Sequence, residues 1–134
     1  MSKLLPFERT FVALDTTDLA HALGLAKALS GHVGGMKVGK EFFTACGPDG
    51  VRAITDCGMP VFMDTKFHDI PNTVAGALRA ALPLHPFIIN VHAAGGEAMM
   101  RAAAQAVAEA GEGRPLLIAI TVLTSLDESD LQAV

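Results

Sequence analysis

Short apolar runs alternate with longer amphipathic segments along the chain. Each apolar run is nearly continuous, which is typical of strands that are buried on both faces of a parallel sheet. Each intervening segment carries apolar residues at helical spacing and ends near a glycine or a proline. The runs predict five strands, at residues 10–15, 33–39, 87–92 and 116–123 and in the run that opens at Val61.

Capping residues and helix breakers predict the helices between these strands. Pro48 is well suited to the first position of the second helix, and this start leaves Phe42 and Phe43 in a short connection. The side chains of Met99 and Met100 are expected to pack the fourth helix onto the sheet. The first predicted helix begins after Thr17 or Asp18 and ends at Gly31, the second begins at Pro48 and ends at Gly58, and the third begins at Pro71 and ends before Pro83. The fourth runs from residue 97 to residue 110, and Ser125 or Asp127 could cap one more helix.

Polar residues gather at the carboxyl ends of all five predicted strands. In a (β/α)8 barrel the active site lies at that end, and several strands contribute to it. The chain has no G-x-G-x-x-G after the first strand and no P-loop motif, so a Rossmann or P-loop fold loses its main support. The pattern predicts an α/β protein in which residues 1–134 form a single domain, about the first five units of a TIM (β/α)8 barrel. The polar residues are Asp15, Lys37, Asp64, Lys66, His92, Thr121 and Thr124.

Composition narrows the possible functions. The chain has 134 residues, 51% of them hydrophobic and 18% charged, with a formal net charge of −4. It has no basic run, tryptophan or tyrosine, which argues against general nucleic-acid binding but allows a small anionic substrate. No apolar run approaches the roughly 18 residues of a membrane span, and the amino terminus is too short and polar for a signal peptide. Cys46 and Cys57 show no metal-ligand spacing, so we expect reduced thiols and a cytoplasmic location.

Charged residues in and beyond the third predicted strand suggest a specific chemistry. Asp64 and Lys66 are two positions apart, so their side chains share one face of a strand, and Asp69 follows just beyond it. With Asp15 and Lys37 they form a nearly charge-balanced set that can hold Lys66 protonated where negative charge develops. A Schiff-base lysine would have to be neutral, which flanking acids oppose. One alternative is a divalent metal held by Asp64 and Asp69. Another is a purely structural ion pair between Asp64 and Lys66, which is the commoner explanation for a D-x-K pattern taken alone.

Five segments of the chain together resemble the orotidine 5'-monophosphate decarboxylase family. The D-x-K-x-x-D motif alone is shared with a wider group of phosphosugar barrels, whereas the longer D-x-K-x-H-D-I-P-x-T-V string is highly specific. The resemblance runs through essentially the whole chain. It implies conversion of orotidine 5'-monophosphate to uridine 5'-monophosphate and carbon dioxide without any cofactor, the last step of de novo pyrimidine synthesis. The segments are residues 13–15, 36–39, 64–74, 90–96 and 123–125.

Matched positions imply individual roles at the active site. Lys66 would protonate carbon 6 of the pyrimidine as carbon dioxide leaves. Asp64 would lie near the substrate carboxylate and help to position Lys66. Asp15 and Lys37 would contact the ribose hydroxyls, and Thr124 would touch the edge of the pyrimidine.

The resemblance also implies a homodimer whose subunits share their active sites. Asp69 would reach into the active site of the partner subunit, and Thr73 would approach the ribose from the same side. His68 also matches a common residue of the family, and we expect its role to be structural. Beyond the nucleotide and the second subunit, no nucleic acid, membrane or metal is expected as a partner.

The chain is short for the predicted fold, because a complete barrel typically needs roughly 250 residues. We therefore expect the later strands and their phosphate-binding loops to be absent, strands one and five to have unpaired edges, and the 134-residue chain to be inactive alone. One alternative is a sister phosphosugar decarboxylase or synthase that uses Mg²⁺, against which Ile70, Pro71 and Thr73 argue. Another is an inactive half-barrel that acts as a binding module.

Overall fold

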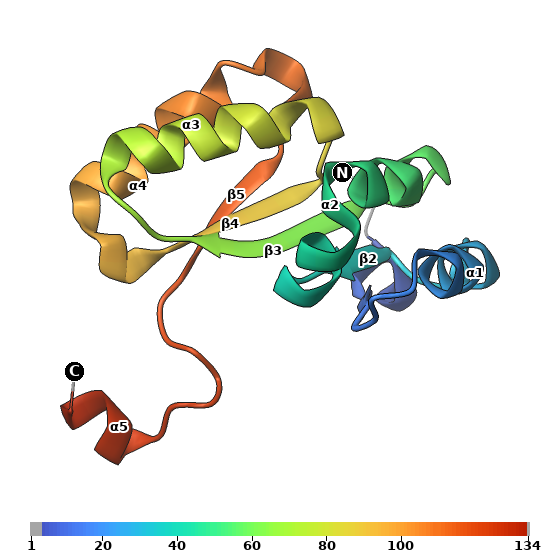
Figure 1. Ribbon diagram of the computed structural model, residues 1–134, viewed down its shortest axis with the longest axis horizontal. Helices are drawn as coiled ribbons and strands as arrows, with labels where there is room; N and C mark the ends of the chain where they lie inside the picture. Colours follow the sequence, from blue (N-terminus) through green and yellow to red (C-terminus); the bar gives the residue numbers. More distant parts are fainter. Residues whose placement is uncertain (1–3, 134) are drawn as a thin grey trace.

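The computed structural model describes residues 4–133 and contains a parallel sheet whose strand order, β1-β2-β3-β4-β5, equals the order along the chain (Figure 1). In a doubly wound fold the strand order reverses at a switch point, whereas in a barrel each strand joins the one before it. The prediction of five consecutive β/α barrel units is therefore confirmed. The strands are β1 (Phe11–Ala13), β2 (Gly35–Val38), β3 (Val61–Phe67), β4 (Ile88–His92) and β5 (Leu116–Ile120).

A helix follows each strand, and most of the predicted boundary signals operate as expected. The Asp18 side chain caps the first helix by accepting hydrogen bonds from the backbone N–H groups of Ala20 and His21. Pro71 occupies the start of the third helix, and Asp127 caps the last one. The helices are α1 (Leu19–Leu29), α2 (Lys40–Asp56), α3 (Pro71–Ala81), α4 (Gly96–Ala108) and α5 (Glu128–Gln132), with short 3-10 helices η1 (Pro6–Arg9), η2 (Leu82–Leu84), η3 (Ala93–Gly95) and η4 (Gly111–Gly113).

The prediction that Phe42 and Phe43 lie in a short connection is wrong. Both residues belong to α2, which kinks at Gly47, where φ is 61°. Glycine adopts this left-handed conformation without steric penalty, and Pro48 restarts the helix immediately after it. The predicted start at Pro48 thus marks only the second half of α2. Phe42 is completely buried, because the first half of the helix packs this side chain into the apolar core.

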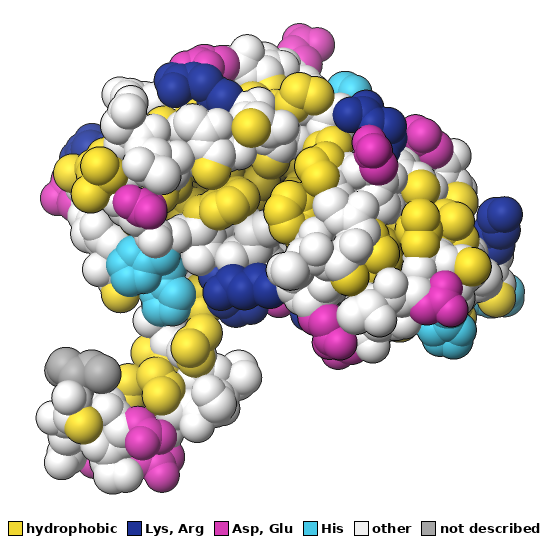
Figure 2. Space-filling model, in the orientation of Figure 1, with side chains coloured by type: hydrophobic (Ala, Val, Ile, Leu, Met, Phe, Trp, Pro, Cys, Tyr) yellow, Lys and Arg dark blue, Asp and Glu magenta, His cyan; other side chains and the backbone are white. Residues whose placement is uncertain are grey.

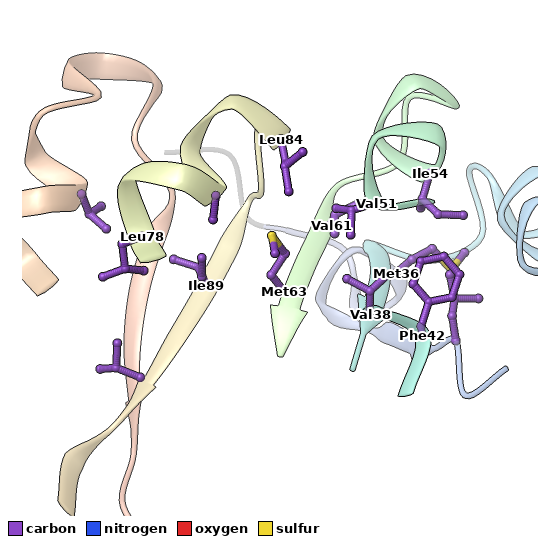
Figure 3. Packing of buried hydrophobic residues seen from close by; sticks show 14 of the residues in the cluster. Met36, Val38, Phe42, Val51, Ile54, Val61, Met63, Leu78, Leu84 and Ile89 are labelled. Carbon is purple, nitrogen blue, oxygen red and sulfur yellow. The ribbon is translucent and has the colours of Figure 1, made fainter. Parts of the chain in front are cut away.

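The side chains of β3 alternate between the two faces of the sheet. Val61 and Met63 belong to the core between the strands and the helices, whereas Asp64 and Lys66 are half-buried and point to the other face. The expected period of two is therefore confirmed for the residues that matter most to the site. Figure 3 shows this core, which includes Met36, Val38, Phe42, Ile54, Leu78 and Ile89.

The second face of the sheet is open and apolar near β5. Leu116 and Ile118 expose 56% and 39% of their surface. β5 ends at Ile120, earlier than the predicted strand, and the chain then runs away from the sheet to α5 (Figure 1). Within residues 4–133, β1 pairs only with β2 and β5 only with β4, so these two strands form the expected edges.

Two further features bear on the setting of the protein. Cys46 and Cys57 are both free thiols. Among the helices of residues 4–133, none combines the length and the apolar character that crossing a bilayer requires.

Candidate active site

Asp64 is the centre of a polar cluster to which three neighbouring strands contribute. The Lys37 ammonium of β2 donates to Asp64 Oδ2 at 3.1 Å, and the Lys66 ammonium of β3 donates to Oδ1 at 2.6 Å. The side-chain amide of Asn90, on β4, also donates to Oδ1, at 2.7 Å. The parallel register carries these residues to the same part of the sheet. The structure therefore brings together three of the predicted site residues, Lys37, Asp64 and Lys66.

The backbone of Lys66 is unusual for a residue within a strand. Its φ of 51° lies in the left-handed region, which residues with a β carbon seldom adopt. The pairing between β3 and β4 is irregular here, with a register shift between Met63 and Phe67. The Lys66 N–H donates to the side-chain oxygen of Asn90 at 2.7 Å. Such conformations persist only where surrounding contacts hold them, and they concentrate at functional sites.

Two ammonium groups share one carboxylate, so the cluster carries a net positive charge. Burial raises the pKa of Asp64, but hydrogen bonds from Lys66, Asn90 and Lys37 outweigh this effect, and the pKa lies below its ordinary value of 3.8. Asp64 is therefore ionised at neutral pH and keeps both ammonium groups in place. The Asp64 side chain is only 12% exposed, which limits screening of these charges by water.

A cavity of about 410 Å³ lies against the cluster. Asp64 and Lys66 form its charged wall, and Phe62 and Ile120 add apolar surface. Thr124, another predicted site residue, lines the same cavity although it follows the end of β5. A mostly apolar cavity with a few convergent charged groups is typical of a site for a small molecule.

Asp15, Asp69 and Thr73 lie outside the cluster. Asp15 is exposed just after β1, and Thr73 is exposed in the first turn of α3. Asp69 is exposed between β3 and α3, where its Oδ1 accepts a hydrogen bond from the N–H of Ile70 at 2.7 Å. The cluster thus has three charged members rather than the five of the expected array, because the loops beyond β1 and β3 place the other two acids at the surface.

The donors around Asp64 do not suit the alternative of a divalent metal. Both of its carboxylate oxygens already accept hydrogen bonds from ammonium or amide groups. Asp69 directs an oxygen to its own backbone neighbour. Elsewhere in the described part of the chain, no three His, Cys, Asp or Glu side chains are grouped so that they could hold a metal ion. The geometry of the site therefore favours lysine chemistry.

Asn90 is not among the residues predicted for the site, although it contacts both Asp64 and Lys66. It is 0% exposed in the middle of β4, between the buried apolar residues Ile89 and Val91. A buried amide needs hydrogen-bond partners, so one asparagine inside an apolar run indicates a polar network. That signal is present in the sequence, but it does not show which neighbouring strand supplies the partners.

His68 and His92 stack on each other beyond the cluster. Their ring centroids are 5.2 Å apart, and the rings are inclined by 21°. A β carbon on Gly95 would lie 3.2 Å from His68 Cδ2, so the His68 ring also packs against the chain that follows β4. Figure 2 shows histidine side chains beside lysine or arginine side chains where the C-terminal segment leaves the body. These contacts fit the predicted structural role of His68, which stays a prediction.

Parallel strands in chain order and a lysine–aspartate cluster on the inner face define the chain as part of a (β/α)8 barrel with a charged site. The sequence profile of the family described as orotidine 5'-phosphate decarboxylase / HUMPS matches residues 8–134. The chain belongs to this family.

Curated relatives agree with this assignment. A protein from Rhodospirillum rubrum named orotidine 5'-phosphate decarboxylase is 55% identical over 126 residues, covering 90% of this chain and 51% of that protein. A protein of the same name from Paramagnetospirillum magneticum is 49% identical over 128 residues, covering 92% of this chain and 54% of its own length. The chain therefore spans about half the length of the curated relatives it matches.

Solved structures show the same architecture. An uncharacterized conserved protein from Geobacillus kaustophilus has a TM-score of 0.84 and 38% identity, over 91% of this chain and 58% of that one. Orotidine 5'-phosphate decarboxylase from Lactobacillus acidophilus has a TM-score of 0.80 and 35% identity, over 92% and 57%. The enzyme from Methanocaldococcus jannaschii in complex with the inhibitor BMP has a TM-score of 0.80 at 24% identity, which supports the fold alone.

Proposed function

We propose that the protein containing this chain converts orotidine 5'-monophosphate to uridine 5'-monophosphate and carbon dioxide in de novo pyrimidine biosynthesis. The observation that carries the proposal is the 2.6 Å ion pair between Lys66 and Asp64, in the wall of a cavity and beside a second ammonium, Lys37. Membership of the family and the names of the curated relatives support the same reaction.

In the proposed reaction, the bond between carbon 6 of the pyrimidine and its carboxylate breaks. Carbon dioxide leaves, and the electron pair of the bond stays on carbon 6. The Lys66 ammonium stabilises this developing carbanion and donates a proton to it, after which water reprotonates the amine. Asp64 holds Lys66 in place and lies near the substrate carboxylate. The chemistry uses the side chains of the protein and no cofactor.

We assign the remaining predicted residues to substrate binding. Lys37 is already anchored to Asp64, and in our proposal it contacts the ribose hydroxyls together with Asp15. Thr124 lines the cavity that holds Lys66, which fits a contact with the edge of the pyrimidine. This arrangement places the base over the ammonium of Lys66 and leaves the sugar over β1 and β2.

We further propose a homodimer in which Asp69 and Thr73 complete the partner's site. Both residues are exposed, and both lie outside the cluster of their own subunit. Exposed positions just before α3 and in its first turn suit residues that contact the active site of a partner subunit rather than the active site of their own subunit. We place this dimer in the cytoplasm, since free Cys46 and Cys57 favour a reducing compartment.

Mixed dimers should reveal a shared site. Asp69→Ala and Lys66→Ala variants should each be nearly inactive alone, whereas a mixture refolded together should regain about a quarter of the wild-type activity per site. In a random mixture half of the dimers are hybrids, and each hybrid has one site free of both substitutions. The measurement is uridine 5'-monophosphate formation against the mixing ratio. A mixture as inactive as its components would contradict the shared site.

A chelator experiment separates the proposed reaction from that of the Mg²⁺-dependent relatives. The protein from the complete coding sequence should convert orotidine 5'-monophosphate at the same rate before and after treatment with EDTA. Uridine 5'-monophosphate is followed by absorbance, and Mg²⁺ is added back as a control. Turnover that falls with EDTA and returns with Mg²⁺ would favour a phosphosugar decarboxylase or synthase.

Residues 1–134 alone should show no turnover, because the open face near β5 leaves the cavity unclosed.

A further inference from the structure

Asn90 is the most deeply buried polar side chain at the candidate site. It lies in the middle of β4 with an exposed fraction of 0%. On one side it pairs in register with Ile118 of β5, which offers it no polar partner. An amide in such a place is costly unless both its donor and its acceptor are bonded. Its hydrogen bonds therefore run to the other side, toward β3.

The two hydrogen bonds of Asn90 reach two different parts of the Asp64–Lys66 pair. Its Nδ2 donates to Asp64 Oδ1 at 2.7 Å, the same oxygen that accepts from the Lys66 ammonium. Its Oδ1 accepts from the backbone N–H of Lys66 at 2.7 Å. One side chain thus holds both the carboxylate and the main chain that carries the ammonium.

The second hydrogen bond, from the backbone N–H of Lys66 to Asn90 Oδ1, stabilises an unusual backbone conformation. Lys66 has a φ of 51°, and β3 shifts its register against β4 at this point. Where the regular ladder is interrupted, a strand N–H loses its usual carbonyl partner and must find another. The amide oxygen of Asn90 fills that role. Without it, relaxation of Lys66 toward an ordinary strand conformation would redirect its side chain relative to Asp64.

We infer that Asn90 is a positioning residue for the reaction proposed above: it fixes the Asp64 carboxylate and the left-handed backbone of Lys66, so that the ammonium stays aimed into the cavity. The inference rests on the proposed function, but Asn90 itself need not touch the substrate. The role requires one donor and one acceptor on a short side chain. Asparagine provides both, whereas an ionised aspartate only accepts and would place a second negative charge against Asp64.

The test is a comparison of Asn90→Asp with the wild-type protein from the complete coding sequence across pH. At neutral pH, kcat for orotidine 5'-monophosphate should fall between about 10- and 100-fold, because small displacements of reacting groups have effects of this size. KM should change less than about threefold, since the substrate contacts remain. As pH falls, kcat of the variant should rise relative to wild type, because a protonated aspartic acid again offers one donor and one acceptor.

The groups that decide this pH response are few. Asp64 and Lys66 face position 90 from β3, Lys37 acts through Asp64 from β2, and β5 presents only Ile118. His92 lies two residues further along β4 and stacks on His68. Because wild type carries all of these groups, the ratio of the two rates reports what the aspartate at position 90 adds, including its coupling to Asp64.

Thr65→Val is the matched control. Thr65 is buried next to the cluster on the opposite face of β3, and its Oγ1 has no hydrogen-bond partner within the described residues. Its kcat and pH profile should match wild type. If Asn90→Asp does not fold, Asn90→Thr provides the test. Threonine packs well in a strand, but its one hydroxyl oxygen is bonded directly to Cβ and cannot occupy the positions of both Nδ2, which contacts Asp64, and Oδ1, which contacts the Lys66 N–H.

The inference is overturned if folded Asn90→Asp or Asn90→Thr turns over at the wild-type rate, or if the deficit of Asn90→Asp is the same at every pH. Folding is checked by circular dichroism and thermal unfolding. If wild type and Thr65→Val do not convert orotidine 5'-monophosphate, the proposed function itself fails. If they do and the Asn90 variants match them, only the role of Asn90 fails.

Discussion

Lys66→Ala is expected to reduce the conversion of orotidine 5'-monophosphate by at least about 1,000-fold. Proton donation by a positioned acid alone contributes on the order of 10²- to 10⁴-fold, and the alanine also removes the positive charge that stabilises the carbanion. The loss should appear in kcat, because the ammonium acts most strongly on the transition state. Single-turnover measurements of uridine 5'-monophosphate provide the test.

The fold should survive this substitution. Lys66 is half-buried at the end of β3, so its removal leaves no large cavity in the core. Lys27→Ala, an exposed change on α1, controls for the loss of one positive charge. A folded Lys66→Ala protein with a rate close to that of the control would remove Lys66 from the role of proton donor.

Asp64→Asn should lower kcat by about 100-fold or more. The variant keeps the size of the side chain but removes the only negative charge between Lys37 and Lys66, which then repel each other. Loss of one preorganised electrostatic group typically costs about 10²- to 10³-fold. Asp49→Asn, an exposed change on α2, serves as the matched control. Wild-type turnover in the Asp64→Asn variant would show that the carboxylate does not organise the site.

The same variant tests the charge of Asp64 through stability. Because the pKa of Asp64 in the folded protein lies below 3.8, the unfolded chain takes up this proton first as pH falls. The ionised Asp64 carboxylate contributes fully to the free energy of unfolding above the pKa that Asp64 has in the unfolded chain. This contribution is lost as pH falls through the pKa that Asp64 has in the folded protein. Urea unfolding should therefore show the largest difference between wild type and Asp64→Asn near neutral pH and a shrinking difference below about pH 3.8. A constant difference would mean that Asp64 is not selectively ionised in the folded state.

Local signals in the sequence account for most of the fold. The cap at Asp18, the helix start at Pro71 and the alternation along β3 depend on residues within one element, and the structure confirms all three. The error at Phe42 arose where the left-handed turn at Gly47 joins two helical segments. Pro48 indicated the start of the second helical segment. No capping or spacing signal in the sequence indicated that the first segment is also helical and packs into the core.

The site could be predicted in part for a similar reason. Asp64 and Lys66 are close in sequence, and Lys37 was predicted from its position near the carboxyl end of the second strand. Asn90 was missed because its two bonds cross from β4 to β3, a relation that depends on register and not on spacing. Asp15 and Asp69 follow strands, but the position of a loop side chain depends on the course of the loop, which the residue pattern does not encode.

The strands lie in the sheet in the order in which they are synthesised, which affects how the site forms during translation. Every strand after β1 pairs with the strand that was made just before it. Each new β/α unit can dock soon after it emerges, because each strand pairing encloses only the one α-helix between the two strands. The ion pairs at Asp64 require only β2 and β3, and Asn90 adds β4. The charged centre of the site can thus assemble in the nascent chain before β5 and the segment carrying Thr124 have emerged from the ribosome.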